Sequence, residues 1–237
     1  MVHLLHIDTS PSPYSVSRRL AASFREVWNE AQPQSTVTYR DLVAEPVPHL
    51  GGDGAATLMA EPQTDGQRTA AALHNELVEE ILAADALLIS VPMHNWTIPS
   101  NLKAWLDQSL ILGRTLPYDP RANPLAGRPA TIVLAHGGDY TPGSEDAAMD
   151  HCGPYLRTVV EQVLGYQLEL ITASHTVTPF TSEDPVELEK AAASLRAAEA
   201  ATVERAPDGP FAAAPLAGHA ITGPVASLSS GRPARSG

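Results

Sequence analysis

The sequence ALLISVPMHNWTIPSNLKAWLD, residues 86–107, joins a short apolar run to a loop of polar and aromatic residues and then to an amphipathic segment. A short apolar run that ends in proline is typical of a buried parallel strand. In open α/β sheets, ligands bind outside the carboxyl ends of such strands, where the strand order reverses and two loops part. Residues 92–96 are therefore predicted to line a ligand-binding crevice.

Four further runs have the character of strands, and helical periodicity follows each of them. One of these runs, residues 36–40, alternates with a polar side, which favours the edge of a sheet. Five successive βα-like units predict an α/β fold with a doubly wound, five-stranded parallel sheet and helices on both faces. The expected strands are residues 2–7, 36–40, 86–91, 130–135 and 167–172, and residues 185–205 are expected to form the closing helix.

Local signals predict where several of these segments begin and end. Ser100 is expected to be the N-cap of the helix that follows the opening motif. Gly165 is expected at the C′ position after the helix of residues 155–164. Residues 41–65 hold several Pro and Gly residues, and a loop of this length is typically a functional cover or disordered.

The composition limits the classes of partner. The chain has 237 residues and a formal net charge of −12, with no Lys/Arg cluster, which disfavours nucleic acid and anionic membranes as partners. No apolar run approaches the ~20 residues of a membrane span, and no signal peptide is recognisable. The sole cysteine, Cys152, excludes an intramolecular disulfide. A cytoplasmic protein is expected.

The chain is expected to contain one folded domain and a tail. Residues 1–206 carry the strand and helix patterns, and a single α/β core routinely reaches this size. Residues 207–237 are rich in Ala, Pro, Gly and Ser and offer few residues for a core. This composition predicts a mostly disordered tail.

The loop after the first expected strand contains the hydroxyl-rich run of residues 9–17. Ser10, Ser15, Val16 and Ser17 lie just before a helix or in its first turn, where hydroxyls, backbone N–H groups and the helix dipole favour a phosphate. The alternative is that Ser15 or Ser17 only caps the helix. The absence of a Gly-x-Gly-x-x-Gly motif argues against a Rossmann pyrophosphate site.

Residues 92–107 resemble the flavin-ring loop of the FMN-dependent NADH azoreductases, a quinone-reductase-like branch of the flavodoxin fold. The shared pattern is Pro-Met-aromatic-Asn-aromatic, followed by Ile-Pro and Leu-Lys-x-x-aromatic-Asp. The resemblance extends from the first strand to about residue 180. It implies the strand order 2-1-3-4-5 and a homodimer with its active sites at the subunit interface. It also implies FMN as cofactor and ping-pong hydride transfer from NADH or NADPH to a quinone or azo compound.

The resemblance assigns site residues to three loops. Ser10, Val16 and Ser17 fall on the phosphate loop, Pro92, Met93, His94, Asn95 and Trp96 on the ring loop, and Ala135, His136, Gly137 and Gly138 on a third loop. A thioether and an indole suit the face of a flat ring, and an amide suits its polar edge. Consecutive glycines let backbone N–H groups approach a ring edge closely. The alternatives are ordinary core residues in the second loop and a simple turn in the third.

The chain departs from the family pattern at several of these positions. The family usually has a polar residue where Val16 stands, Tyr where His94 stands, and Ser-Arg where Ala135 and His136 stand. Two histidines at a ring edge have the pKa range of an acid or base, so His94, His136 and the amide Asn95 are the catalytic candidates. The alternative is that both histidines have no chemical role.

Other functional classes receive less support. His136, Asp139, His151 and Cys152 lack metal-ligand spacing, so no metal site is expected. Two alternatives to a quinone or azo reductase stay open. One is a dedicated FMN-dependent enzyme of a small-molecule biosynthetic pathway, and the other is a flavin-free binding protein on the same scaffold.

Overall fold

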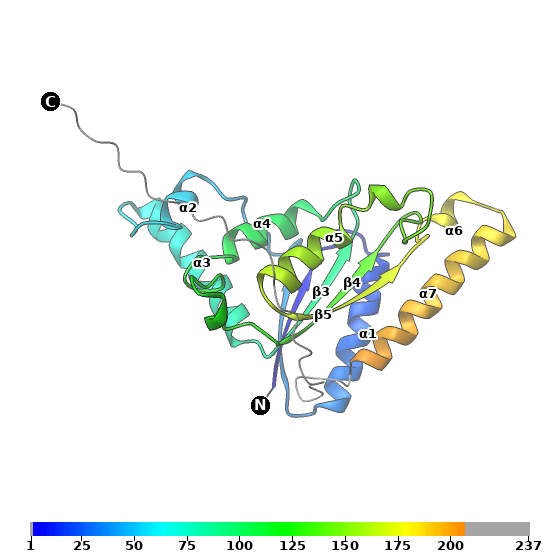
Figure 1. Cartoon of the computed structure of the whole chain (residues 1–237), viewed down its shortest axis with the longest axis horizontal. Coiled ribbons are helices and arrows are strands. Elements are labelled where there is room, and N and C mark those ends of the chain that lie inside the picture. Colours follow the sequence, from blue (N-terminus) through cyan, green and yellow to red (C-terminus); the bar gives the residue numbers. More distant parts are fainter. Residues whose placement is uncertain (1, 207–237) are drawn as a thin grey trace.

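The computed structural model describes residues 2–206, which form one five-stranded parallel sheet in the order β2-β1-β3-β4-β5 (Figure 1). The strands are β1 (His3–Asp8), β2 (Thr36–Asp41), β3 (Ala86–Pro92), β4 (Pro129–Ala135) and β5 (Gln167–Ala173). The predicted doubly wound, flavodoxin-like sheet is confirmed, and β2 lies at its edge as expected. The order reverses between β1 and β3, whose carboxyl ends therefore form the switch point at which α/β proteins bind ligands.

Helices cover both faces of the sheet (Figure 1). On one face lie α1 (Val16–Ala31) and α7 (Pro185–Arg205), which contact each other. On the other face lie α3 (Asp65–Ala83), α4 (Ser100–Ser109) and α5 (Gly153–Leu156), which continues as the π-helix η3 (Arg157–Val163). Two short helices, α2 (Gly52–Thr57) and α6 (Thr178–Thr181), lie in connecting segments, as do the 3₁₀ turns η1 (Pro120–Ala122) and η2 (Ala147–Met149).

The core divides into two layers because successive side chains of a strand point to opposite faces. Leu5 and Ile7 of β1 belong to the layer beneath α3, α4 and α5, where Trp105 is almost completely buried. Leu4 belongs to the layer beneath α1 and α7, together with Trp28. Both faces of the sheet are thus covered, which explains why its central strands read as continuous apolar runs.

The local structure bears on three of the sequence predictions. The Ser100 prediction is wrong by one position: Ser100 is the first residue of α4, and Pro99 occupies the N-cap without a side-chain bond. Residues 41–65 are ordered enough to include α2, and the carbonyl of Pro48 accepts a 2.8 Å hydrogen bond from Gln108 of α4. Gly165 follows the last helical turn with φ of +75°, the left-handed conformation predicted for a C′ glycine.

The predicted tail, residues 207–237, lies outside the described residues. Within residues 2–206, no helix is both long and apolar enough to cross a membrane. The same residues contain no group of three or more His, Cys, Asp and Glu side chains that could hold a metal ion.

Candidate active site at the carboxyl edge of the sheet

The loop between β1 and α1 presents unpaired backbone donors. Ser15 is the N-cap of α1, and its Oγ accepts a hydrogen bond from the backbone N–H of Arg18 at 3.2 Å. Ser15 therefore caps the helix, and its role in ligand binding stays a prediction. The backbone N–H groups of Val16 and Ser17 have no acceptor among residues 2–206. Free N–H groups at the positive end of a helix dipole make this turn suitable for an anion.

A buried ionic network supports this loop from below, and sequence analysis missed it. Asp8, at the end of β1, is fully buried and accepts hydrogen bonds from Ser90 Oγ at 2.8 Å and Tyr39 OH at 2.9 Å. Arg18 Nε lies 2.8 Å from Asp8 Oδ2, and its Nη2 donates to the carbonyl of Ser10 at 2.7 Å. Burial and the neighbouring Asp8 carboxylate raise the pKa of Tyr39 to about 12. The network ties the loop to three strands.

The loop after β3 forms a tight hairpin. The backbone N–H of His94 donates to Thr97 O at 2.9 Å, and Thr97 N–H donates back to His94 O at 3.1 Å. Asn95 and Trp96, between them, have φ of +47° and +65°, as the two central residues of a type I′ turn require. Asn tolerates this conformation, whereas a bulky Trp adopts it at an energetic cost. His151 N–H donates to Trp96 O at 2.9 Å and helps to hold the turn.

The loops after β4 and β5 are joined by backbone hydrogen bonds. Thr176 N–H donates to His136 O at 3.0 Å, and His175 N–H donates to Gly138 O at 3.0 Å. The backbone N–H groups of Gly137 and Gly138 have no acceptor among residues 2–206. These two groups are available to a ligand at the carboxyl edge of the sheet.

The side chain of His136 does not face the same space as its neighbours. Its ring is buried, with 3% of the residue exposed, and both ring nitrogens lack a partner within residues 2–206. It packs edge-on against Tyr140, with ring centroids 5.5 Å apart. Burial lowers the pKa of His136, although Asp150 and Asp139 oppose this effect. An acid or base role for His136 stays a prediction.

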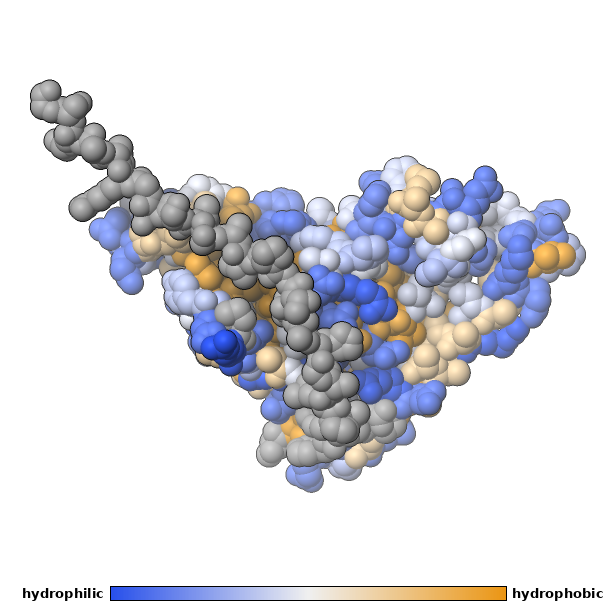
Figure 2. Space-filling model, in the orientation of Figure 1, coloured by the Kyte–Doolittle hydropathy of each residue, from blue (hydrophilic) through white to orange (hydrophobic). Residues whose placement is uncertain are grey.

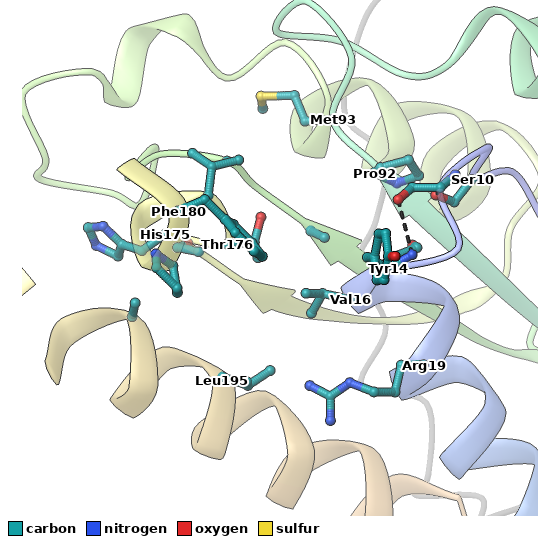
Figure 3. A pocket seen from close by; sticks show the side chains of 18 of the residues that line it. Ser10, Tyr14, Val16, Arg19, Pro92, Met93, His175, Thr176, Phe180 and Leu195 are labelled. Carbon is teal, nitrogen blue, oxygen red and sulfur yellow. Dashed lines mark hydrogen bonds between the residues drawn. The ribbon is translucent and has the colours of Figure 1, made fainter. Parts of the chain in front are cut away.

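A cavity of about 760 Å³ opens where these loops converge (Figure 3). The three sequence-predicted loops contribute Ser10, Ser15, Val16, Pro92, Met93, His94, Ala135 and Gly137 to its lining. Five predicted site residues lie outside this lining: Ser17, Asn95, Trp96, His136 and Gly138. Asn95 instead lines a second cavity of about 520 Å³ that includes Lys103 and Tyr155. His94 borders both cavities, which makes it the junction between them.

A fourth wall of the large cavity was not predicted from the sequence. It comes from the loop after β5, from α6 and from the first half of α7, and it is mostly apolar. Its members are Ser174, His175, Thr176, Val177, Pro179, Phe180, Leu188, Ala191, Ala192 and Leu195. The residues that directly follow β5, beginning with Ser174, could have been predicted from the end of that strand, because all parallel strands end at the same edge of the sheet.

The mouth of this cavity carries exposed aromatic side chains. Tyr14 and Phe180 both belong to the lining, yet they are 88% and 83% exposed. Figure 2 shows a hydrophobic spot at the corner where α6 and α7 meet, among hydrophilic neighbours; Phe180 and Val186 are exposed in this part of the chain. Exposed apolar side chains around a cavity are typical of a ligand-binding site.

Comparison with known proteins places the chain in a family. A family profile described as "Flavodoxin-like fold" matches residues 2–199. The chain belongs to this flavodoxin-like family. Within the family, a protein of Streptomyces coelicolor named "FMN-dependent NADH:quinone oxidoreductase" is 43% identical over 183 residues, which cover 76% of this chain and 82% of the relative. A protein of the same name from Streptomyces avermitilis is 42% identical over 181 residues. The predicted resemblance is confirmed.

Solved structures agree with this family assignment at the level of the fold. An azoreductase from Bacillus anthracis str. Sterne superimposes with a TM-score of 0.75 at 22% identity, covering 88% of this chain and all of that one. An FMN-dependent NADH-azoreductase from Bacillus anthracis str. Ames Ancestor, solved in complex with FMN, gives a TM-score of 0.72 at 23% identity. These likenesses show that the chain shares the overall fold of those structures.

The residues of the cavity fit a phosphorylated flavin. The free N–H group of Val16 and the hydroxyl of Ser10 suit a phosphate, and the free N–H group of Ser17 follows directly in the same helical turn. Met93 offers an apolar surface to a flat ring, and the free N–H of Gly137 offers a donor to its polar edge. A volume of about 760 Å³ lies within the range of roughly 300–1,000 Å³ that is usual for cofactor sites.

Proposed function

We propose that this protein is an FMN-dependent NADH:quinone oxidoreductase. One observation carries the proposal: the loops after β1, β3 and β4 border a single cavity at the switch point of a flavodoxin-like sheet, in a chain 43% identical to a relative with that name. Neither alternative from the sequence gains support from a specific contact. The dedicated pathway enzyme relied partly on His136, whose ring is buried beside Tyr140.

The chain's own residues divide the work of binding and orientation. The first turn of α1, with Val16, would hold the phosphate, and Ser10 would support it. Pro92 and Met93 would cover the ring, and Gly137 would donate to its edge. When bound, FMN supplies two-electron redox chemistry, namely hydride acceptance from NADH and reduction of a quinone to a quinol. The protein supplies position and electrostatics and keeps water from the reacting atoms.

His94 is the side chain best placed for proton transfer to an acceptor. It borders both cavities and is only partly buried, and its backbone is fixed by the hairpin bonds to Thr97. A fixed backbone and an accessible ring are what general acid catalysis requires of a histidine. Asn95, which lines the second cavity, would form a hydrogen bond with an acceptor bound there. NADPH as a second donor and azo compounds as further acceptors belong to the same proposal.

We also propose that the protein acts as a homodimer in the cytoplasm, with each active site completed at the subunit interface. Support comes from the exposed apolar side chains at the mouth of the cavity, such as Tyr14 and Phe180, which a second subunit would cover. Sedimentation equilibrium of the full chain tests this proposal. A monomer at all micromolar concentrations would contradict it.

The central test is spectroscopic. Purified protein with FMN should show the absorption of a bound flavin, and NADH under anaerobic conditions should bleach it. Addition of a quinone, without further NADH, should then restore the absorption of the oxidised flavin. Protein that binds no FMN, or bound FMN that NADH does not bleach, would refute the proposed function. Comparison of quinones, azo dyes and NADPH in the same assay would rank the donors and acceptors.

A further inference from the structure

Arg19 is the only Arg or Lys among the side chains that line the large cavity within the described part of the chain. It belongs to α1 and lies three residues after Val16, so both residues share the face of the helix that borders the cavity. Figure 3 shows its side chain extending from α1 towards Leu195 of α7. No sequence pattern singled out this arginine.

The neighbouring arginine has a different task. Arg18 is engaged by Asp8 at 2.8 Å, by Asp41 at 3.1 Å and by the carbonyl of Ser10 at 2.7 Å. These partners neutralise its charge and hold it beneath the loop. Arg19 has one acidic partner, Glu199 of α7, at 2.9 Å. Of the two arginines, Arg19 is therefore the one available to the cavity.

The ion pair between Arg19 and Glu199 is of a kind that is easily exchanged. The Arg19 side chain is 54% exposed and the Glu199 side chain 42% exposed. Exposed ion pairs contribute little to the free energy of folding, because solvent screens their attraction and two long side chains must be immobilised. A carboxylate and a phosphate can both bind a guanidinium through two hydrogen bonds, but the phosphate carries more negative charge, which makes it the stronger partner.

The direction of helical side chains brings Arg19 within reach of the anion-binding turn. Cα–Cβ bonds in an α-helix tilt towards its N-terminus, so a side chain covers the turn before its own Cα. For Arg19 that preceding turn contains Val16 and Ser17, whose backbone N–H groups are free. A guanidinium that leaves Glu199 can therefore lie beside an anion held by these two N–H groups.

We propose that Arg19 is a phosphate ligand of this cavity, held by Glu199 when the cavity contains no anion and transferred to the phosphate of FMN when the cofactor binds. The inference rests on the proposed function and deepens it, because it adds a cationic ligand for the phosphate. The third loop, which the family resemblance assigns to the edge of the ring, has the buried His136 where the family has Arg, and within the described residues the one Arg or Lys of the cavity lining comes from α1.

The test compares FMN with riboflavin, which has the same ring and no phosphate. Flavin fluorescence quenching measures both dissociation constants for the flavin-free full-length protein and its variants. Arg19→Gln should weaken FMN binding about tenfold, or ~1.4 kcal/mol, and leave riboflavin binding within about twofold. Arg19→Lys should lie between the two because it keeps the charge and loses the bidentate geometry. Glu199→Gln should tighten FMN binding about two- to threefold, because Arg19 is released from its competing partner.

A matched control is available on α7. Arg196 pairs with Glu189 at 2.7 Å, is similarly exposed, and lies outside the cavity lining, so Arg196→Gln should change neither dissociation constant. Circular dichroism of Arg19→Gln verifies folding. Equal weakening of FMN and riboflavin, or unchanged FMN binding in Arg19→Gln or Glu199→Gln, would overturn this inference alone. Failure of the wild-type protein to bind either flavin would overturn the proposed function as well.

Discussion

His6 makes the stability of this fold depend on pH. It lies in the centre of β1 with 1% of its surface exposed, and neither ring nitrogen has a hydrogen-bond partner within residues 2–206. Its ring packs against Tyr39, with centroids 5.0 Å apart. Burial, together with the nearby positive charges of Arg25 and Arg18, lowers the pKa of His6 from 6.5 to about 3.

The sign follows from proton binding. Between pH 6.5 and 3 the unfolded chain binds a proton at this histidine and the folded chain does not, so the free energy of unfolding falls as the pH falls. Each pH unit within that window is worth about 1.36 kcal/mol. From pH 7.5 to 5.5, the contribution of His6 amounts to a loss of about 1.4 kcal/mol. The lower limit stays above the sequence pI of about 5.1, where solubility is lowest.

The perturbation is His6→Leu, which removes the titrating group and keeps an apolar side chain of similar size. Urea unfolding at pH 7.5, 6.5 and 5.5 should show that wild-type protein loses about 1.4 kcal/mol more than the variant over this range. The variant should also be more stable at pH 7.5, because it no longer buries two unpaired nitrogens. His151→Gln, at an exposed histidine, is the matched control and should follow the wild type. Parallel curves for wild type and His6→Leu would refute the reasoning.

Three further predictions concern a thiol, a helix cap and a turn. Cys152 is fully buried, and burial raises its pKa to about 12, so Ellman's reagent at pH 8 should react with it only after unfolding in urea; rapid reaction of the native protein would contradict the structure. Thr64→Ala removes the capping box of α3 and should lower the free energy of unfolding by about 1 kcal/mol in urea, whereas Thr64→Ser should retain most of it. Gly165→Ala places a Cβ at φ of +75°, only 2.8 Å from Asn123 Nδ2. It should lower the free energy of unfolding by at least about 1–2 kcal/mol, measured as a lower thermal midpoint. Gly127→Ala, at a similar φ but with no neighbouring atom within 4 Å, should lower it less.

Much of the fold could be predicted from the order of local patterns. The apolar runs at residues 86–91 and 130–135 became central strands, and the more polar run at 36–40 became the edge strand β2. These patterns are informative because a strand covered on both faces has few positions at which a polar side chain can reach water, whereas an edge strand has one polar side. The strand order itself came from the family resemblance and was confirmed by the structure.

The candidate site was only partly predictable. Three loops could be placed on one edge of the sheet, since parallel strands end together. The orientation of side chains within those loops could not, because a loop has no fixed period: Ala135 and Gly137 line the cavity, and the ring of His136 between them is buried against Tyr140. The turn at Asn95 and Trp96 requires positive φ at both residues, which the sequence does not signal without glycine.

The sequence by itself determined the αβ alternation, the buried and edge strands, and the position of the turn at the start of α1 that we propose as the phosphate site. Each of these depends on residues close together in the chain. Tertiary structure alone decided that Asp8, Arg18 and Tyr39 form one network, and that Arg19, which lines the cavity, pairs with Glu199 of α7. Such pairs lie as many as 180 residues apart. Their proximity is a consequence of how the helices pack on the completed sheet, and no local periodicity records it.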